Sequence, residues 1–386
     1  PRRACSGPNQ QSETGGVPKQ GAPHSHRLVD KMTDTFSIPA SNLADAYRRR
    51  SLRRVLAVLV LGLVLIASVV FDIVSGPSNL GFADVVRILV NPTAAEVQER
   101  VIVWDLRLPV ALMALAVGAM LGIAGAEMQT ILSNPLADPF TLGISSAASF
   151  GAALAIVTHI SLIPGLEAVM VTGNAFVMAL LTAAILFAFT RLRGVSTEGM
   201  VLVGIALMFS FNALLGLLQY GSTEVQLAQI VFWMMGSLAR ATWMKLAVCG
   251  AVLAVVVPWF MSRNWALTAL RMGDEKAASL GVNVSRLRIE MLVGVSLLSA
   301  VAVSFVGTIA FVGLVGPHIA RMVVGEDQRF FLPFSALAAG LLMSLTSILS
   351  KVINPGVIYP IGMITALIGI PFFVSLILTA RKRNWQ

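Results

Sequence analysis

The sequence predicts an all-α polytopic membrane protein with about ten transmembrane helices. Its 386 residues are 56% hydrophobic and only 12% charged, whereas soluble domains carry about 25% charged residues. The mean hydropathy is +0.82. Apolar runs of about 20 residues, the length that spans a bilayer, recur along the chain. Short basic flanks separate these runs, as is typical of membrane proteins with positively charged cytoplasmic loops.

The expected helices can be placed from these apolar runs. They lie near 53–74, 106–131, 141–159, 169–190, 197–219, 241–260, 286–306, 308–323, 331–352 and 358–380. If the N-terminus is inside, seventeen Arg and Lys residues fall in the inner flanks and six in the outer segments. This asymmetry predicts a multi-pass protein with both termini in the cytoplasm.

The N-terminal 50 residues differ in composition from the rest of the chain. They are rich in Pro, Gly, Ser and Gln without periodicity, which predicts a disordered cytoplasmic tail over 1–50 before a transmembrane domain over 51–383. Met32 opens a candidate start, so we expect residues 1–31 to be an upstream extension and not a native working part. The arginines at 48–50 lead into a run long enough to span, which favours an uncleaved first helix.

The most informative stretch runs from residue 107 to residue 153. Gly118, Gly122 and Ala126 fall four apart, which favours close approach of two helix backbones in lipid. The apolar run then breaks, and a bare helix in lipid cannot continue through such residues. We expect a hinge that lines a pathway or faces another protein; an ordinary cytoplasmic turn is the alternative. The hinge residues are Asn134, Pro135, Asp138 and Pro139.

Several motifs carry a resemblance to a known family. RLP before a glycine-rich helix, then GAxxQ, NPLADP and LGIS, together resemble the permease subunits of bacterial ABC importers for iron–siderophores, haem and cobalamin, the FecCD family. FVGLVGPHIAR and PxGxxTALIGxPFF extend the resemblance from Leu52 to Arg383. It implies the architecture of a type II ABC importer permease in the bacterial inner membrane. The phosphate-binding motif GxxxxGK[ST] is absent from the sequence, so we expect a transport subunit without its own ATPase site.

The resemblance also implies the substrate and the partners. We expect import of a ferric siderophore complex, powered by two separate ATP-binding subunits and supplied by a periplasmic substrate-binding protein. A second permease copy or a paralogue would complete the pathway. Haem or cobalamin is the alternative substrate, because a path lined by small apolar residues suits any bulky chelate. The four histidines show no metal-ligand spacing beyond the pair His24 and His26 in the tail, so neither a cofactor nor a bound metal is expected. The basic residues lie in short flanks between apolar runs, so no nucleic-acid partner is expected either.

Two other functional classes are less compatible with the residues. An ion-coupled secondary transporter would need paired intramembrane charges and recognisable repeats, whereas Glu127 stands nearly alone. An integral-membrane enzyme would need a cluster of His, Asp and Glu or a nucleophile with its base, and the sequence shows no such cluster.

By resemblance, two pairs of residues receive roles at the two ends of the pathway. Arg107 and Lys351 match basic positions at which the family docks its binding protein. The alternative is that both merely extend to the interface, as cations at helix ends do. Ser196 and Thr197 match the small hydroxyl residues of the cytoplasmic gate. The alternative is N-capping of the following helix.

The loop Ala266–Arg288 resembles the coupling segment that docks on the ATP-binding subunit. It is the largest inner loop and contains a short amphipathic helix, whereas an ordinary solvated loop is the alternative reading. The expected coupling residues are Gly273, Asp274, Glu275, Ser279, Leu280 and Gly281.

Further polar residues within the apolar runs need a role. The Glu127 carboxylate is a functional candidate because such a group is costly in lipid, but we favour a structural role in which it hydrogen-bonds the hinge. Pro317 is expected to break its helix, with His318 stabilising the break or the ATPase contact. Asn212 and Gln219 are expected to face the bundle interior, since an amide in lipid would be unpaired.

Overall fold

The computed structural model describes residues 40–76, 80–93, 95–163, 169–193, 197–354 and 356–383, and this part of the chain contains helices and no β-strand. Seven helices are long and apolar enough to cross a membrane, and three shorter helices are also apolar. Their positions confirm the ten predicted segments. The long helices are α2 (Ala40–Val74), α5 (Leu108–Ile131), α7 (Met170–Arg193), α8 (Thr197–Tyr220), α10 (Trp243–Ser262), α13 (Val284–Val306) and α15 (Gln328–Val352). The shorter apolar segments are α6 (Ile144–Thr158), α14 (Val312–Val323) and the first part, Ile361–Ser375, of α16 (Ile361–Arg383).

Short helices connect the spans; the sequence predicted α12 among them as a short amphipathic helix, and the others were not predicted. Most lie at the ends of the bundle. They are α3 (Phe82–Val90), α4 (Val97–Arg100), the π-helical segment η1 (Val101–Arg107), the 3-10 turns η2 (Pro139–Leu142) and η4 (Leu238–Arg240), α9 (Glu224–Met234), α11 (Asn264–Leu270) and α12 (Asp274–Ser279).

Two details differ from the sequence-based expectation. Helix α2 begins at Ala40, so the last residues of the predicted tail are helical, and most of that tail lies outside the described residues. Helix α14 continues through Pro317, so the expected break there was wrong. Pro317 is the sixth of the twelve residues of α14 and has no N–H to donate to the Gly313 carbonyl, yet the helix runs on to Val323.

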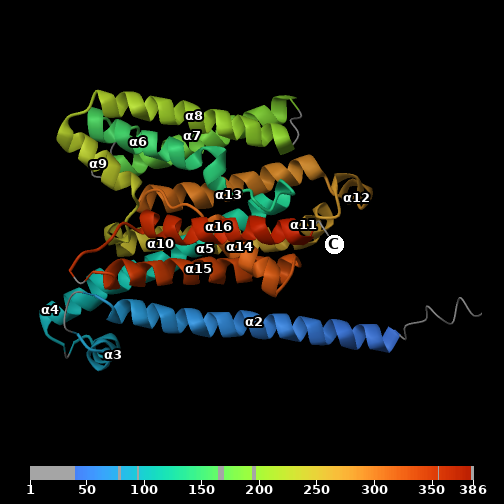
Figure 1. Cartoon of the computed structure of the whole chain (residues 1–386), viewed down its shortest axis with the longest axis horizontal. Helices are drawn as coiled ribbons and strands as arrows, with labels where there is room; N and C mark the ends of the chain where they lie inside the picture. Colours follow the sequence, from blue (N-terminus) through green and yellow to red (C-terminus); the bar gives the residue numbers. More distant parts are fainter. Residues whose placement is uncertain are drawn as a thin grey trace, which may run out of the picture. The chain divides into compact units, whose positions relative to one another are not determined.

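The centre of the bundle is formed by α5, α13, α14 and α15. Helix α5 packs against each of the other three, most extensively against α15. Figure 1 shows α6, α7, α8 and α9 together on one side of these central helices, with α11 and α12 at one end. The chain divides into two compact units, 1–52 and 53–386, and the sites described below lie entirely in the second.

The contact between α5 and α15 depends on two glycines, which have no side chain. A Cβ atom added at Gly118 would lie 2.6 Å from the Ala339 carbonyl oxygen, and one added at Gly122 would lie 2.5 Å from the Ser335 carbonyl oxygen. The two helix backbones therefore touch directly, as the spacing of small residues predicted. In lipid, where no hydrophobic effect drives helices together, such close packing is a main source of association.

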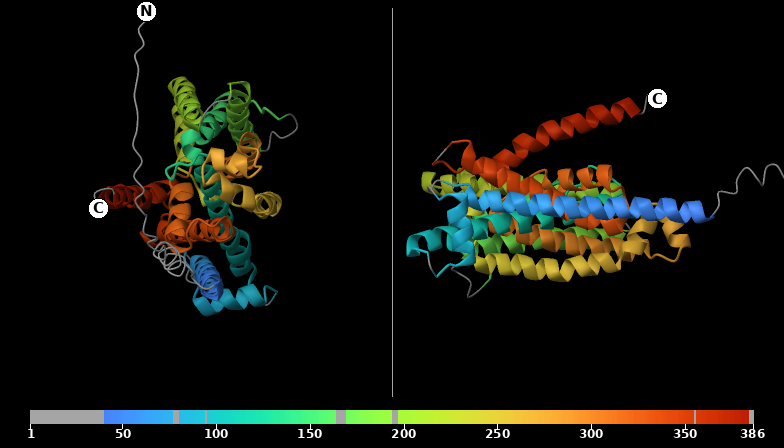
Figure 2. Two further views of the ribbon diagram at one scale, coloured as in Figure 1. Left: turned by 90° about the vertical axis from the view of Figure 1, so that its right-hand side faces the viewer. Right: turned by 90° about the horizontal axis from the view of Figure 1, so that it is seen from below.

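Helix α16 is anchored at its start and leaves the bundle further along. The Ile361 N–H donates to the Gly236 carbonyl (3.1 Å) and the Gly362 N–H to the Met235 carbonyl (3.0 Å), which ties α16 to the end of α9. Both views in Figure 2 show α16 diverging from the other helices as it proceeds. A single chain therefore leaves much of this helix uncovered.

We expect Gly122→Ala to lower the stability of the purified chain by about 1–3 kcal/mol, the usual cost of overpacking. The added methyl group would meet the α15 backbone, and this clash outweighs the better helix propensity of alanine. Thermal unfolding in detergent measures the effect. Gly250→Ala in α10 is the matched control, because nothing lies within 4 Å of its added Cβ. Equal melting temperatures for the two variants would contradict the packing argument.

Candidate functional site

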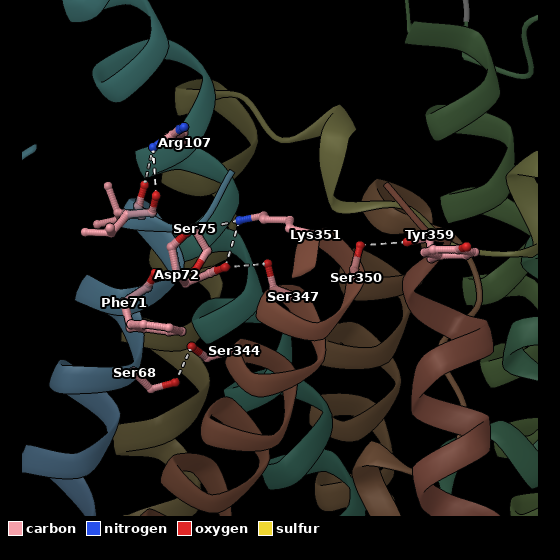
Figure 3. A network of polar contacts seen from close by, with 12 residues as sticks. Ser68, Phe71, Asp72, Ser75, Arg107, Ser344, Ser347, Ser350, Lys351 and Tyr359 are labelled. Atoms are coloured by element: carbon pink, nitrogen blue, oxygen red, sulfur yellow. Dashed lines mark hydrogen bonds and ion pairs between the residues drawn. The ribbon is translucent and has the colours of Figure 1, made fainter. Parts of the chain in front are cut away.

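A chain of polar contacts joins α2 to α15 at the end of the bundle opposite α12 (Figure 3). Lys351 Nζ lies 2.7 Å from Asp72 Oδ1, and the Ser347 hydroxyl donates to the same oxygen at 2.9 Å. One turn further into the bundle, the hydroxyls of Ser68 and Ser344 lie 2.8 Å apart. Asp72 is completely buried and the Lys351 side chain is 9% exposed. This buried ion pair fixes α2 against α15.

Arg107 holds the end of α2 from the other side. It is buried at the last residue of η1, and its Nη1 donates to the carbonyl oxygens of Ile73 and Val74, each at 3.0 Å. A Cβ atom added at Gly76 would lie 2.8 Å from Arg107 Nη2, so the chain that leaves α2 passes directly over the guanidinium. Arg107 therefore fixes the end of α2 to the start of α5.

The two residues predicted to dock a binding protein lie at one cavity of about 440 Å³. Its lining is mostly apolar and includes Arg107, Lys351 and Tyr359. The structure thus brings the predicted pair together, with both side chains buried and engaged within the chain, and their docking role stays a prediction. Asp72, the partner of Lys351, was missed; a lone carboxylate near the end of the first apolar run was the available signal.

The predicted hinge lies at the opposite end of α5. The helix ends at Ile131, and side chains of the hinge hold the turn that follows. Asn134 Oδ1 accepts from the Leu136 N–H at 2.9 Å, and Asp138 Oδ1 accepts from the Phe140 N–H at 3.0 Å. These side chain–backbone bonds satisfy amides that the helix no longer pairs. The break in the apolar run is therefore an ordered, internally bonded turn.

The predicted coupling segment is joined to this hinge by one arginine. Arg288 donates to both carboxylate oxygens of Asp274, each at 2.8 Å, and its Nε donates to the Ile131 carbonyl at 2.9 Å. Arg288 thus connects α12 to the last turn of α5. The sequence alone predicted no role for Arg288. The predicted coupling residues are all exposed: Gly273, Asp274, Glu275, Ser279, Leu280 and Gly281.

The gate residues are only partly covered by the structure. Ser196 lies outside the described residues, and Thr197 is described as the first residue of α8. Their role in a cytoplasmic gate stays a prediction.

Two other expectations were wrong. Glu127 is fully buried, but neither carboxylate oxygen has a hydrogen-bond partner in the described part of the chain, so it does not bond the hinge. Asn212 is exposed on the surface of the single chain and does not face its interior. Gln219 is partly buried, and its Nε2 lies 3.6 Å from the Met234 sulfur.

The His318 ring packs edge-on against Phe372 of α16, with 5.6 Å between ring centroids.

We expect Lys351→Met to destabilise the chain by about 3 kcal/mol, because it leaves the buried Asp72 without its counter-charge. Asp72→Asn should also destabilise it. The double variant should lose less than the sum of the two single variants, since no unpaired charge is left behind. A double-mutant cycle from thermal unfolding measures the coupling, and additive effects would show that the pair does not fix α2.

Asp138 should make stability depend on pH. Burial raises the pKa of this carboxyl to about 6, against the lowering effect of the hydrogen bond from the Phe140 N–H. The folded chain therefore binds a proton more tightly than the unfolded chain, and the free energy of unfolding falls as the pH rises from about 4 to about 6. Asp138→Asn keeps an oxygen acceptor and should flatten this slope. Thermal unfolding across this range tests it, with exposed Glu224→Gln as the control; an unchanged slope in Asp138→Asn would contradict it.

Comparisons with known proteins agree with these features. The model of the FecCD transport family matches residues 64–379. The chain is 35% identical over 328 residues to the hemin transport system permease protein HmuU of Yersinia pestis, covering 84% of this chain and 97% of that protein. It is 35% identical over 291 residues to the vitamin B12 import system permease protein BtuC of Vibrio vulnificus, covering 74% and 85%. A solved ABC transporter described as metal-chelate type, in an inward-facing conformation, matches with a TM-score of 0.72 and 31% identity over 84% of this chain and 99% of that one. The chain therefore belongs to the FecCD family of ABC importer permeases.

Proposed function

We propose that this permease moves a ferric siderophore complex across the bacterial inner membrane, with both termini in the cytoplasm. The observation that supports transport driven from outside the chain is the link from an exposed α12 through Arg288 to the end of α5. A protein that pushes on α12 would act on a central helix and on the hinge that follows it. Haem and vitamin B12, which the relatives' names give, are the alternative substrates.

Two ATP-binding subunits would supply that push. The six exposed coupling residues lie within α12 or directly next to it. This helix is too short to be stable by itself and is held in place by the two bonds from Arg288 to Asp274. A positive φ of 102° at Gly273 sets the direction in which α12 leaves the preceding turn. A held, protruding helix of this kind suits a cleft in a separate subunit.

A second permease copy, or a paralogue, would complete the pathway. Asn212 is exposed on α8 of the single chain, and an amide that faces lipid would be unpaired and costly. Helix α16 also leaves the bundle and exposes Leu367, Ile370 and Val374. A second copy placed against α8 and α16 would cover both surfaces and enclose a central path, with Ser196 and Thr197 at its inner mouth.

A periplasmic binding protein would dock at the end that holds Arg107 and Lys351. Acidic side chains on its lobes would compete for these cations with Asp72 and with the carbonyls of Ile73 and Val74. Docking would then loosen α2 from α15 at this end of the bundle.

The test is ATPase activity of the reconstituted complex with its ATP-binding and binding-protein partners. A panel of ferric siderophores, haem and cobalamin, each loaded on the binding protein, would be compared. Stimulation by one ferric siderophore is the expected result. Stimulation by haem or cobalamin alone would overturn the substrate proposal and leave the importer role intact.

In the same complex, Arg288→Gln should lower substrate transport per ATP hydrolysed by about tenfold, equivalent to about 1.4 kcal/mol of lost coupling. The change removes the fork on Asp274 and the bond to the Ile131 carbonyl. Arg286→Gln, two residues away with a side chain 75% exposed, is the matched control. If both variants transported as well as the unmodified chain, Arg288 would not be the coupling link.

A further inference from the structure

A second cavity, of about 260 Å³, lies at the end of the bundle that carries the hinge and α12. Three segments that are distant in the sequence meet there. They are the hinge at Ser133–Pro135, the turn at Arg271 that precedes α12, and the end of α14 with its connection to α15, which contribute Arg321 and Glu326. The cavity has room for a tetrahedral oxyanion together with several waters, since a water occupies about 30 Å³.

Two residues that line the cavity have a buried hydrogen-bond donor without a partner in the described part of the chain. Gln129 is 2% exposed, and its Nε2 is unpaired while its Oε1 accepts from Arg321 Nη2 at 2.9 Å. Arg321 Nη1 is likewise buried and unpaired. Arg271 uses only Nη1, which donates to the Glu326 carbonyl at 2.7 Å. Buried donors without partners are costly, so a ligand that supplies acceptors would be stabilised here.

The charges on the lining favour an anion. Two guanidiniums face one carboxylate, and that carboxylate is already engaged by both: Glu326 Oε1 accepts from Arg321 Nε at 2.9 Å, and Glu326 Oε2 lies 3.5 Å from Arg271 Nη1. Glu127 is buried nearby without lining the cavity, and it attracts Arg271. The guanidinium carbon of Arg271 lies 4.8 Å from the Phe331 ring centroid and that of Arg321 lies 5.6 Å from it. This packing on one ring fixes the positions of both guanidiniums. Guanidiniums held in this way bind phosphate well, because their fork matches its oxygens.

We propose that this cavity binds a phosphate group. Arg271 and Arg321 would supply the charge, with Gln129 and the polar side chains of the hinge completing the donors. The bound group would bridge the hinge, the segment before α12 and the α14–α15 connection, and so hold these three segments in the arrangement seen here. Inorganic phosphate and the phosphate headgroup of an anionic lipid share this chemistry, and the experiment separates them.

The experiment measures binding of radiolabelled inorganic phosphate to the full chain, purified in detergent without added lipid, by equilibrium dialysis at constant ionic strength. We expect saturable binding at one site and a matching rise in the melting temperature. Phosphatidic acid, compared with phosphatidylcholine, is then added as competitor. Competition by phosphatidic acid assigns the site to a lipid headgroup, and its absence assigns it to the free ion.

Arg271→Gln should weaken phosphate binding by at least about tenfold (about 1.4 kcal/mol), whereas exposed Arg286→Gln should not change it. Gln129→Glu is a second variant that should lose phosphate binding and still fold. The change is nearly isosteric and places a carboxylate beside Arg321. This variant should melt no lower than the unmodified chain and should no longer respond to phosphate. If neither phosphate nor phosphatidic acid binds saturably, or if Arg286→Gln weakens binding as much as Arg271→Gln, the proposal is overturned.

Discussion

The direct backbone contact between α5 and α15 is the constraint on which the rest of the structure depends. It exists because Gly118 and Gly122 have no side chain where the α15 carbonyls pass. In a membrane, where apolar surface gains nothing from leaving lipid, such contact replaces the hydrophobic effect as the source of helix association. The result is a central pair of helices that cannot separate without losing many small attractions at once.

The polar contacts at both ends of the molecule are built on this pair. At one end, Arg107 at the start of α5 and Lys351 near the end of α15 hold the same helix, α2, by its carbonyls and by Asp72. At the other end, the last carbonyl of α5 accepts from Arg288, which also grips α12. A rigid helix with a polar clamp at each end can carry a displacement between the two faces of a membrane, and this is what an importer driven from one face requires.

Much of the fold could be predicted from the sequence, because spans of about 20 apolar residues leave a direct signal. The close packing at Gly118 and Gly122 and the break after Ile131 were also predicted from the sequence. The pairing of Asp72 with Lys351 was not, since 279 residues separate the two and only the fold brings them together. Asn212 could not be placed from the sequence for a different reason: a polar residue in an apolar run is assigned to the interior of its own chain, whereas Asn212 lies exposed on the surface of α8. Glu127 was expected to bond the hinge because the two are near in sequence, but its carboxylate oxygens have no hydrogen-bond partner in the described part of the chain.

If the proposed function is right, the chain moves substrate only when separate ATP-binding subunits act on α12. Uptake of a ferric siderophore into proteoliposomes tests it most directly. The chain would be reconstituted alone or with its ATP-binding and binding-protein partners, with ATP on the α12 side. We expect accumulation only with the partners and ATP. Accumulation by the chain alone, driven by a proton or sodium gradient, would contradict the account.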